Sequence, residues 1–88
     1  MLNFDRTLIT EEQHIMMAER ISKLHVKKLT LLMNECYIQY DGPTRWPLPK
    51  NCEILYLDYG NNLLKNVVNN LSLSLANCDT LKEIIISF

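Results

Sequence analysis

The chain has 88 residues, 48% of them hydrophobic and 22% charged, a composition typical of one small globular domain and not of a disordered segment. Nine Lys and Arg residues against ten Asp and Glu residues give a formal net charge of -1, which lacks the basic excess that nucleic-acid binding needs. The apolar runs are shorter than a membrane span, so we expect neither nucleic acid nor a membrane as a partner.

The first predicted element is a helix over about residues 11–24. Thr10 and Gln13 have the spacing of a capping box, in which the Thr side chain and the Gln side chain each bond to the other residue's backbone N–H. Apolar residues then recur at three-residue steps, at Ile15, Ala18, Ile21 and Leu24. This pattern predicts a helix with one buried stripe.

A strand is predicted next, over about residues 26–33, because an apolar run of strand length follows two lysines. Residues 41–51 contain all three prolines and the single tryptophan, and we expect a loop there because proline fixes φ and lacks an N–H donor. Residues 53–59 form the clearest predicted strand, and Gly60 ends it.

A second helix is predicted over about residues 62–76, since Leu63, Val67, Leu71 and Leu75 lie four apart. A third strand is predicted over 82–88, which contains three consecutive isoleucines. The strand, helix and strand together favour a parallel β-α-β unit. We therefore expect one α/β domain over residues 1–88, with a small sheet and an N-terminal helix.

One spacing occurs three times in the chain. The pattern has apolar residues at its first, fourth and sixth positions, and it begins at Val26, Cys52 and Leu81. These starting points lie 26 and 29 residues apart. The first copy continues to Asn34 and Cys36, so residues 26 to 88 resemble the leucine-rich repeat family. In the second copy Gly60 stands at the asparagine position. The resemblance implies a short leucine-rich-repeat-like fold with a ligand-binding concave face, and the alternative is an unrelated compact α/β fold with the same elements.

The residues that could carry chemistry are dispersed. His14 and His25 lie eleven positions apart, and the three cysteines, Cys36, Cys52 and Cys78, form no CxxC pair. We predict no catalytic residue, metal ligand or cofactor, and therefore no enzyme. The cysteines are expected to be free core thiols of a cytoplasmic protein, in agreement with an N-terminus that lacks a signal-peptide core.

Two surfaces could bind a partner. Arg45 and Trp46 lie in the proline-rich loop and are residue types common at interface hot spots, although Trp46 could instead fold back as a lid over the core. The second surface comes from strand alternation, which turns Thr30, Leu32, Ile54, Tyr56, Asp58, Glu83, Ile85 and Ser87 away from the helices. Either the N-terminal segment or another molecule should cover so apolar a face. The predicted partner-binding residues are Arg45, Trp46, Ile54, Tyr56, Asp58 and Ile85.

The function that these features favour is a non-enzymatic protein-protein interaction module. The alternative is a small phage- or virus-type inhibitor, like the anti-CRISPR proteins, that blocks a host enzyme or immune complex. Because residues 84–88 lack proline and charge, we also expect a homodimer that protects this strand edge. A position of strand 82–88 between strands 26–33 and 53–59 would protect the edge without a partner.

Overall fold

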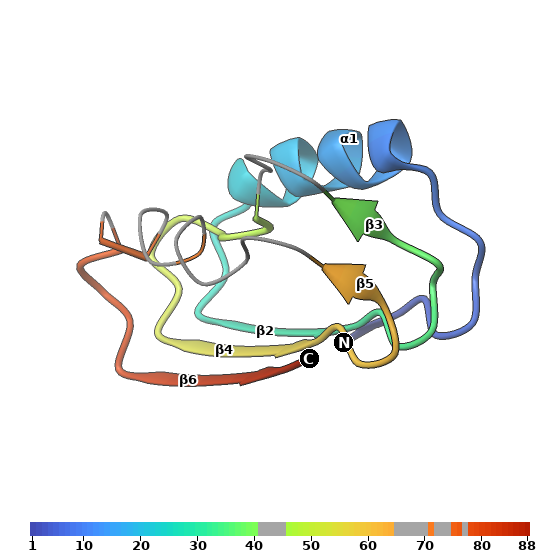
Figure 1. The fold of residues 1–88 in the computed structure, drawn as a ribbon. Coiled ribbons are helices and arrows are strands. Elements are labelled where there is room, and N and C mark those ends of the chain that lie inside the picture. The colour runs from blue at the N-terminus through green and yellow to red at the C-terminus, as the bar shows by residue number, and fades with distance from the viewer. Residues whose placement is uncertain (41–45, 65–70, 72–74, 77) are drawn as a thin grey trace.

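The computed structural model describes residues 1–40, 46–64, 71, 75–76 and 78–88. Its main element is a four-stranded parallel sheet of β1 (Leu2–Asn3), β2 (Lys28–Leu32), β4 (Ile54–Asp58) and β6 (Glu83–Ser87). The helix α1 (Glu11–Ser22) and a two-stranded sheet of β3 (Gln39–Tyr40) and β5 (Leu63–Leu64) lie on one side of it (Figure 1). The protein therefore has the compact α/β fold expected from the sequence.

The order of the large sheet is β1-β2-β4-β6, so β6 is an edge strand. The alternative that places this strand between β2 and β4 is therefore wrong. The N-terminal segment does not cover the sheet either, because β1 extends the sheet at the edge of β2. Sequence analysis missed β1, which is only two residues long.

The register of the sheet brings the repeated positions side by side. Leu29 pairs with Leu55, which pairs with Ile84, and Leu31 pairs with Leu57, which pairs with Ile86. Leu29, Leu31, Leu55 and Leu57 are buried in the core. The interval between repeats in the sequence is thus the interval between residues that pair on neighbouring strands of the sheet.

Helix α1 begins with the predicted capping box. The Thr10 side chain accepts from the Gln13 N–H at 3.1 Å, and Gln13 Oε1 accepts from the Thr10 N–H at 3.0 Å. The helix ends two residues earlier than predicted, and its buried residues are His14, Ala18 and Ile21. Since Leu24 is 46% exposed, the predicted stripe is wrong at its C-terminal end and His14 occupies a core position instead.

The predicted helix over 62–76 is wrong at its start, where Leu63–Leu64 form β5 and pair with β3. The Leu63 N–H donates to the Ile38 carbonyl at 3.0 Å, and this bond holds the segment in an extended conformation. Leu71 and Leu75 have helical backbone conformation and pack on the core, and residues 65–70 and 72–74 of the predicted helix lie outside the described residues.

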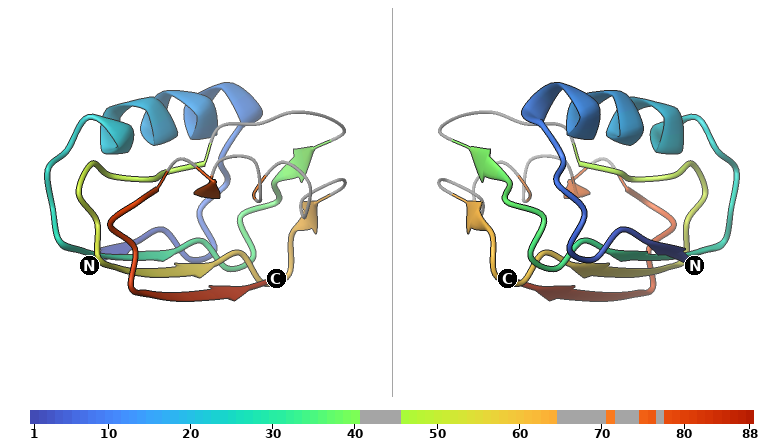
Figure 2. Two further views of the ribbon diagram at one scale, coloured as in Figure 1. Left: turned by 90° about the vertical axis from the view of Figure 1, so that its left-hand side faces the viewer. Right: turned by 90° about the vertical axis from the view of Figure 1, so that its right-hand side faces the viewer.

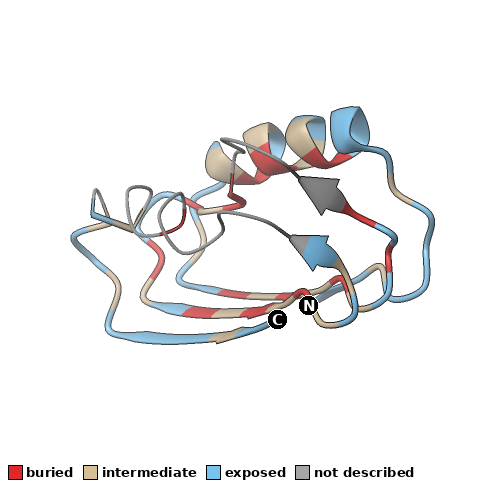
Figure 3. Ribbon diagram, viewed as in Figure 1, coloured by how far each residue is buried: buried red, intermediate tan, exposed pale blue. Residues whose placement is uncertain are grey.

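The core lies between the large sheet and the layer that covers it. Figure 3 shows buried residues along β2 and β4, whereas β6 is exposed over most of its length. Views from both ends show α1, β3 and β5 on one side of the sheet (Figure 2), and no described element lies over the opposite side. In the described part of the chain, no helix has the length and apolar content to span a membrane.

Candidate functional site

The uncovered side of the large sheet carries the candidate functional site, which we call the open face. Alternate residues of β2, β4 and β6 point to this side, because successive side chains of a strand lie on opposite faces. The open face comprises Lys28, Thr30, Leu32, Ile54, Tyr56, Asp58, Glu83, Ile85 and Ser87. Alternation therefore brings together the predicted site residues of two strands.

Tyr56 lies at the centre of the open face. The sheet register places it between Thr30 and Ile85, and places Ile54 in the adjacent row between Lys28 and Glu83. A shallow depression of about 360 Å³ is formed here by Lys28, Thr30, Leu32, Ile54, Leu55, Tyr56, Glu83 and Ile85. Ile54 is 37% and Ile85 is 50% exposed, so apolar surface lines the depression.

Charged side chains border the depression at one end. Lys28 and Glu83 flank Ile54 in the same row, one on each side. At the other end of the open face, Asp58 stabilises the turn after β4, because its Oδ1 accepts from the Gly60 N–H at 2.9 Å. The open face therefore has an apolar centre and a charged border of both signs, the arrangement typical of protein interfaces.

Four of the six predicted site residues, Ile54, Tyr56, Asp58 and Ile85, share the open face. Trp46 does not lie at a surface: it is 4% exposed and its ring packs edge-on against Tyr59 and Phe88. The prediction of Trp46 as an exposed binding residue is therefore wrong, and the lid interpretation agrees with its burial. Arg45 lies outside the described residues.

Asn62 holds the turn after β4, and sequence analysis missed it. Its Oδ1 accepts from the backbone N–H groups of Cys36 and Ile38 at 3.0 and 3.1 Å. Its Nδ2 donates to the carbonyls of Met33 and Tyr59 at 2.8 and 2.9 Å. One side chain thus joins the turns after β2 and β4, which fixes the spacing of the two strands that carry most of the open face.

A sequence signal for Asn62 exists, two positions after Gly60, where the apolar pattern has its asparagine position. Leu57-x-Tyr59-x-x-Asn62 repeats Leu31-x-Met33-x-x-Cys36 with an offset of 26 residues. The thiol of Cys36 donates to the Phe4 carbonyl at 2.9 Å, as the Asn62 amide does to Met33. Asn34, at the asparagine position of the apolar pattern, uses its side-chain oxygen to accept from the Asn61 side chain at 2.9 Å, and its backbone N–H donates to Asp5 Oδ1 at 2.8 Å.

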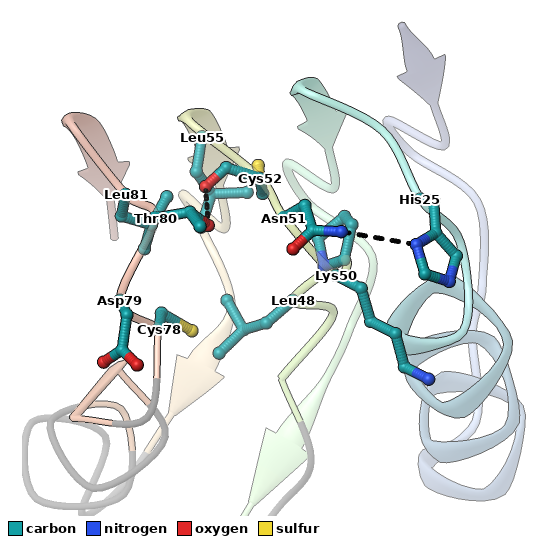
Figure 4. A pocket seen from close by; sticks show the side chains of 11 residues that line it. His25, Leu48, Lys50, Asn51, Cys52, Leu55, Cys78, Asp79, Thr80 and Leu81 are labelled. Atoms are coloured by element: carbon teal, nitrogen blue, oxygen red, sulfur yellow. Dashed lines mark hydrogen bonds between the residues drawn. The ribbon is translucent and has the colours of Figure 1, made fainter.

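A second cavity, of about 470 Å³, lies where the segments before β2, β4 and β6 meet (Figure 4). His25, Cys52 and Cys78 line it, one from each segment. Burial raises the pKa of both thiols, so neither is a ready thiolate at neutral pH. Among the described residues, no three His, Cys, Asp or Glu side chains are grouped to hold a metal ion.

His14 is fully buried, and its Nε2 lies 2.7 Å from the Tyr59 hydroxyl. Burial lowers the pKa of His14 from 6.5 to about 4, so the ring is neutral at physiological pH. Because the side chain is fully buried and bonds to a core residue, we assign it a structural role.

Comparisons with protein-family models, curated proteins and solved structures found no match to this chain. Function is therefore inferred from the geometry of the open face and of the turns that support it.

Proposed function

We propose that the chain is a non-enzymatic protein-interaction module that binds a protein partner on the open face. The observation that carries this proposal is the depression around Tyr56, an apolar hollow on a side of the sheet that no described element covers. Exposed apolar patches with a polar border mark protein-binding sites. Tyr is also among the residue types that contribute most binding energy at interfaces.

The module we propose is built like a leucine-rich repeat. Two observations support this: the repeated apolar positions are neighbours in the sheet, and the Asn62 side chain bonds successive turns. In a repeat fold the parallel strands line the ligand-binding surface, which corresponds to the open face here. Cys36 and Cys52 are free thiols, which supports a cytoplasmic location, since thiols persist in a reducing compartment.

The partner should present an apolar segment to Tyr56, Ile54 and Ile85. Lys28 and Glu83 lie on opposite sides of Ile54, so the partner should place an acidic group near the first and a basic group near the second. Both charges lie at the border of the depression, where they favour orientation and association rate more than affinity.

The proposal is tested by affinity capture from an extract of the cells that make the protein, with wild type and Tyr56→Ala side by side. Met16→Ala is the matched control, because Met16 is 52% exposed on α1, which lies on the other side of the sheet. We expect a protein that wild type and Met16→Ala retain and Tyr56→Ala loses. Its affinity, measured with purified components, should fall at least about tenfold in Tyr56→Ala.

Circular dichroism and melting temperature must first show that both variants are folded. If Tyr56→Ala retains every captured protein as well as wild type does, or if wild type retains no protein above background, the open face is not a binding surface and the proposal is wrong.

A further inference from the structure

The outer edge of β6 presents backbone groups that have no partner in the described part of the chain. The Glu83 N–H donates to the Glu53 carbonyl at 3.0 Å, and the Ser87 carbonyl accepts from the Tyr59 N–H at 2.8 Å. In a strand these roles alternate, so residues 83, 85 and 87 bond to β4. Ile84 and Ile86 consequently direct their N–H and C=O groups away from β4, toward the outside.

This edge is also apolar and regular. Ile84 and Ile85 are 40% and 50% exposed, and Phe88 directly after β6 is 56% exposed. The pairing of β6 with β4 runs without a bulge over five residues, and the strand contains no proline and one charged residue, Glu83. Natural edge strands are usually protected by a bulge, a proline or charged side chains, and an edge without these features is a template for strand pairing.

We propose that β6 pairs in antiparallel orientation with β6 of a second copy of the chain, around a two-fold axis at Ile85. An axis normal to the sheet keeps both open faces on one side, and residues opposite each other must then belong to the same face. Side chains on the same face of β6 lie an even number of positions apart, so two residues that pair across the axis must differ by an even number of positions. The axis therefore passes between the two copies of one residue, and not between the two copies of one peptide bond. Ile85 is the central residue of β6, and the axis there pairs all five residues of the strand.

This register fits the chemistry of the edge. Ile84 lies opposite Ile86 of the second copy, and these are the residues whose backbone groups point outward, so they form the hydrogen-bonded pairs. Glu83 lies opposite Ser87 of the second copy, so no like charges face each other. The two four-stranded sheets become continuous, and Ile85 of each copy contacts the other at the axis.

The pairing goes beyond the proposed function and does not depend on it. The open faces stay uncovered and join into one surface, so a partner could bind the dimer at two equivalent places. Dimerisation is measured on the isolated protein, and partner binding is measured with the captured protein, so failure of one leaves the other testable.

The test is the solution mass of the full chain, by analytical ultracentrifugation at micromolar concentrations. We expect wild type at twice the chain mass of 10.3 kDa. Ile84→Pro removes an N–H that points outward and leaves the bonds to β4 in place. Ile85→Lys places two like charges at the axis. Both variants should therefore be monomers with unchanged circular dichroism. Tyr56→Lys and Met16→Lys are the matched controls and should remain dimers.

A monomeric wild type throughout this concentration range would overturn the proposal. So would a dimer that Tyr56→Lys dissociates and Ile84→Pro does not, because the copies would then associate through their open faces. If Ile84→Pro does not fold, Ile85→Lys decides alone, and a folded dimer of that variant contradicts the edge pairing.

Discussion

His14 Nε2 and the Tyr59 hydroxyl lie 2.7 Å apart in the core, and this hydrogen bond joins helix α1 to the residue that follows β4. The rings of His14 and Tyr59 meet edge-on, with centroids 5.5 Å apart. The Trp46 ring also packs edge-on against Tyr59, with a distance of 5.2 Å between the ring centroids. A polar contact of this kind is directional, so it fixes where α1 lies over the sheet in a way that apolar packing alone does not.

Stability should therefore depend on the charge of His14. Burial lowers its pKa in the folded protein to about 4, whereas the unfolded chain takes up the proton near the ordinary value of 6.5. The unfolded state binds more protons between these values, so the free energy of unfolding falls as pH decreases through this window. Between pH 7 and pH 5 we expect a loss of about 2 kcal/mol from this group.

Urea denaturation at both pH values measures the loss, and His14→Gln is the control because it removes the titrating group and keeps polar atoms. Carboxylates titrate in both proteins, so the informative quantity is the difference between wild type and variant. An identical pH dependence in the two proteins would mean that His14 is not buried as a neutral ring.

Trp46→Ala should destabilise the protein severely. The side chain is 4% exposed and packs on Tyr59 and Phe88, and truncation of a buried aromatic residue costs about 3 to 5 kcal/mol. Trp46→Phe should cost much less, because it keeps a ring and the indole N–H has no hydrogen-bond partner among the described residues. Thermal melting distinguishes the variants. A Trp46→Ala protein with the melting temperature of wild type would show that Trp46 is not part of the core.

Asn62→Ala should destabilise the chain by about 2 to 3 kcal/mol, because it leaves the buried N–H groups of Cys36 and Ile38 without an acceptor. Asn34→Ala removes an exposed bond to the Asn61 side chain and should cost less than about 1 kcal/mol. Chemical denaturation of both variants compares the two positions directly. Equal losses would contradict the central role of Asn62 in the turns.

The three cysteines should differ in their reactivity toward iodoacetamide. Cys36 and Cys52 are buried and Cys78 is partly exposed, and burial raises the pKa of each thiol. We expect Cys78 to be alkylated first at neutral pH, at least about tenfold faster than the other two, and all three to react readily in denaturant. Peptide mass mapping over time gives the order, and rapid labelling of Cys36 in the folded protein would disagree with its burial.

The sequence predicted features that arise from local chemistry and spacing. Thr10 and Gln13 form their capping box because both partners lie within one helical turn, and the 26-residue offset of the apolar pattern became the register of Leu29 with Leu55. The start of the second helix was mispredicted because a bond from Leu63 to the distant Ile38 carbonyl outweighs the local four-residue spacing.

Long-range contacts also explain the errors at the candidate site. The sequence of the proline-rich loop is compatible with Trp46 at the surface or in the core, and its packing against Tyr59 and Phe88 decides between them. Strand alternation, in contrast, predicted the side of the sheet on which Ile54, Tyr56 and Ile85 lie, since that side follows from the period of two in any strand.

The open face as a protein-binding surface is tested most directly by methyl NMR of the protein with and without its captured partner. We predict that the methyl resonances of Ile54, Ile85 and Leu32 shift on binding, while those of the core residues Leu31 and Leu57 and of Met16 on α1 stay near their positions in the free protein. Shifts confined to Met16 and other methyl groups of α1, with Ile54 and Ile85 unchanged, would contradict it.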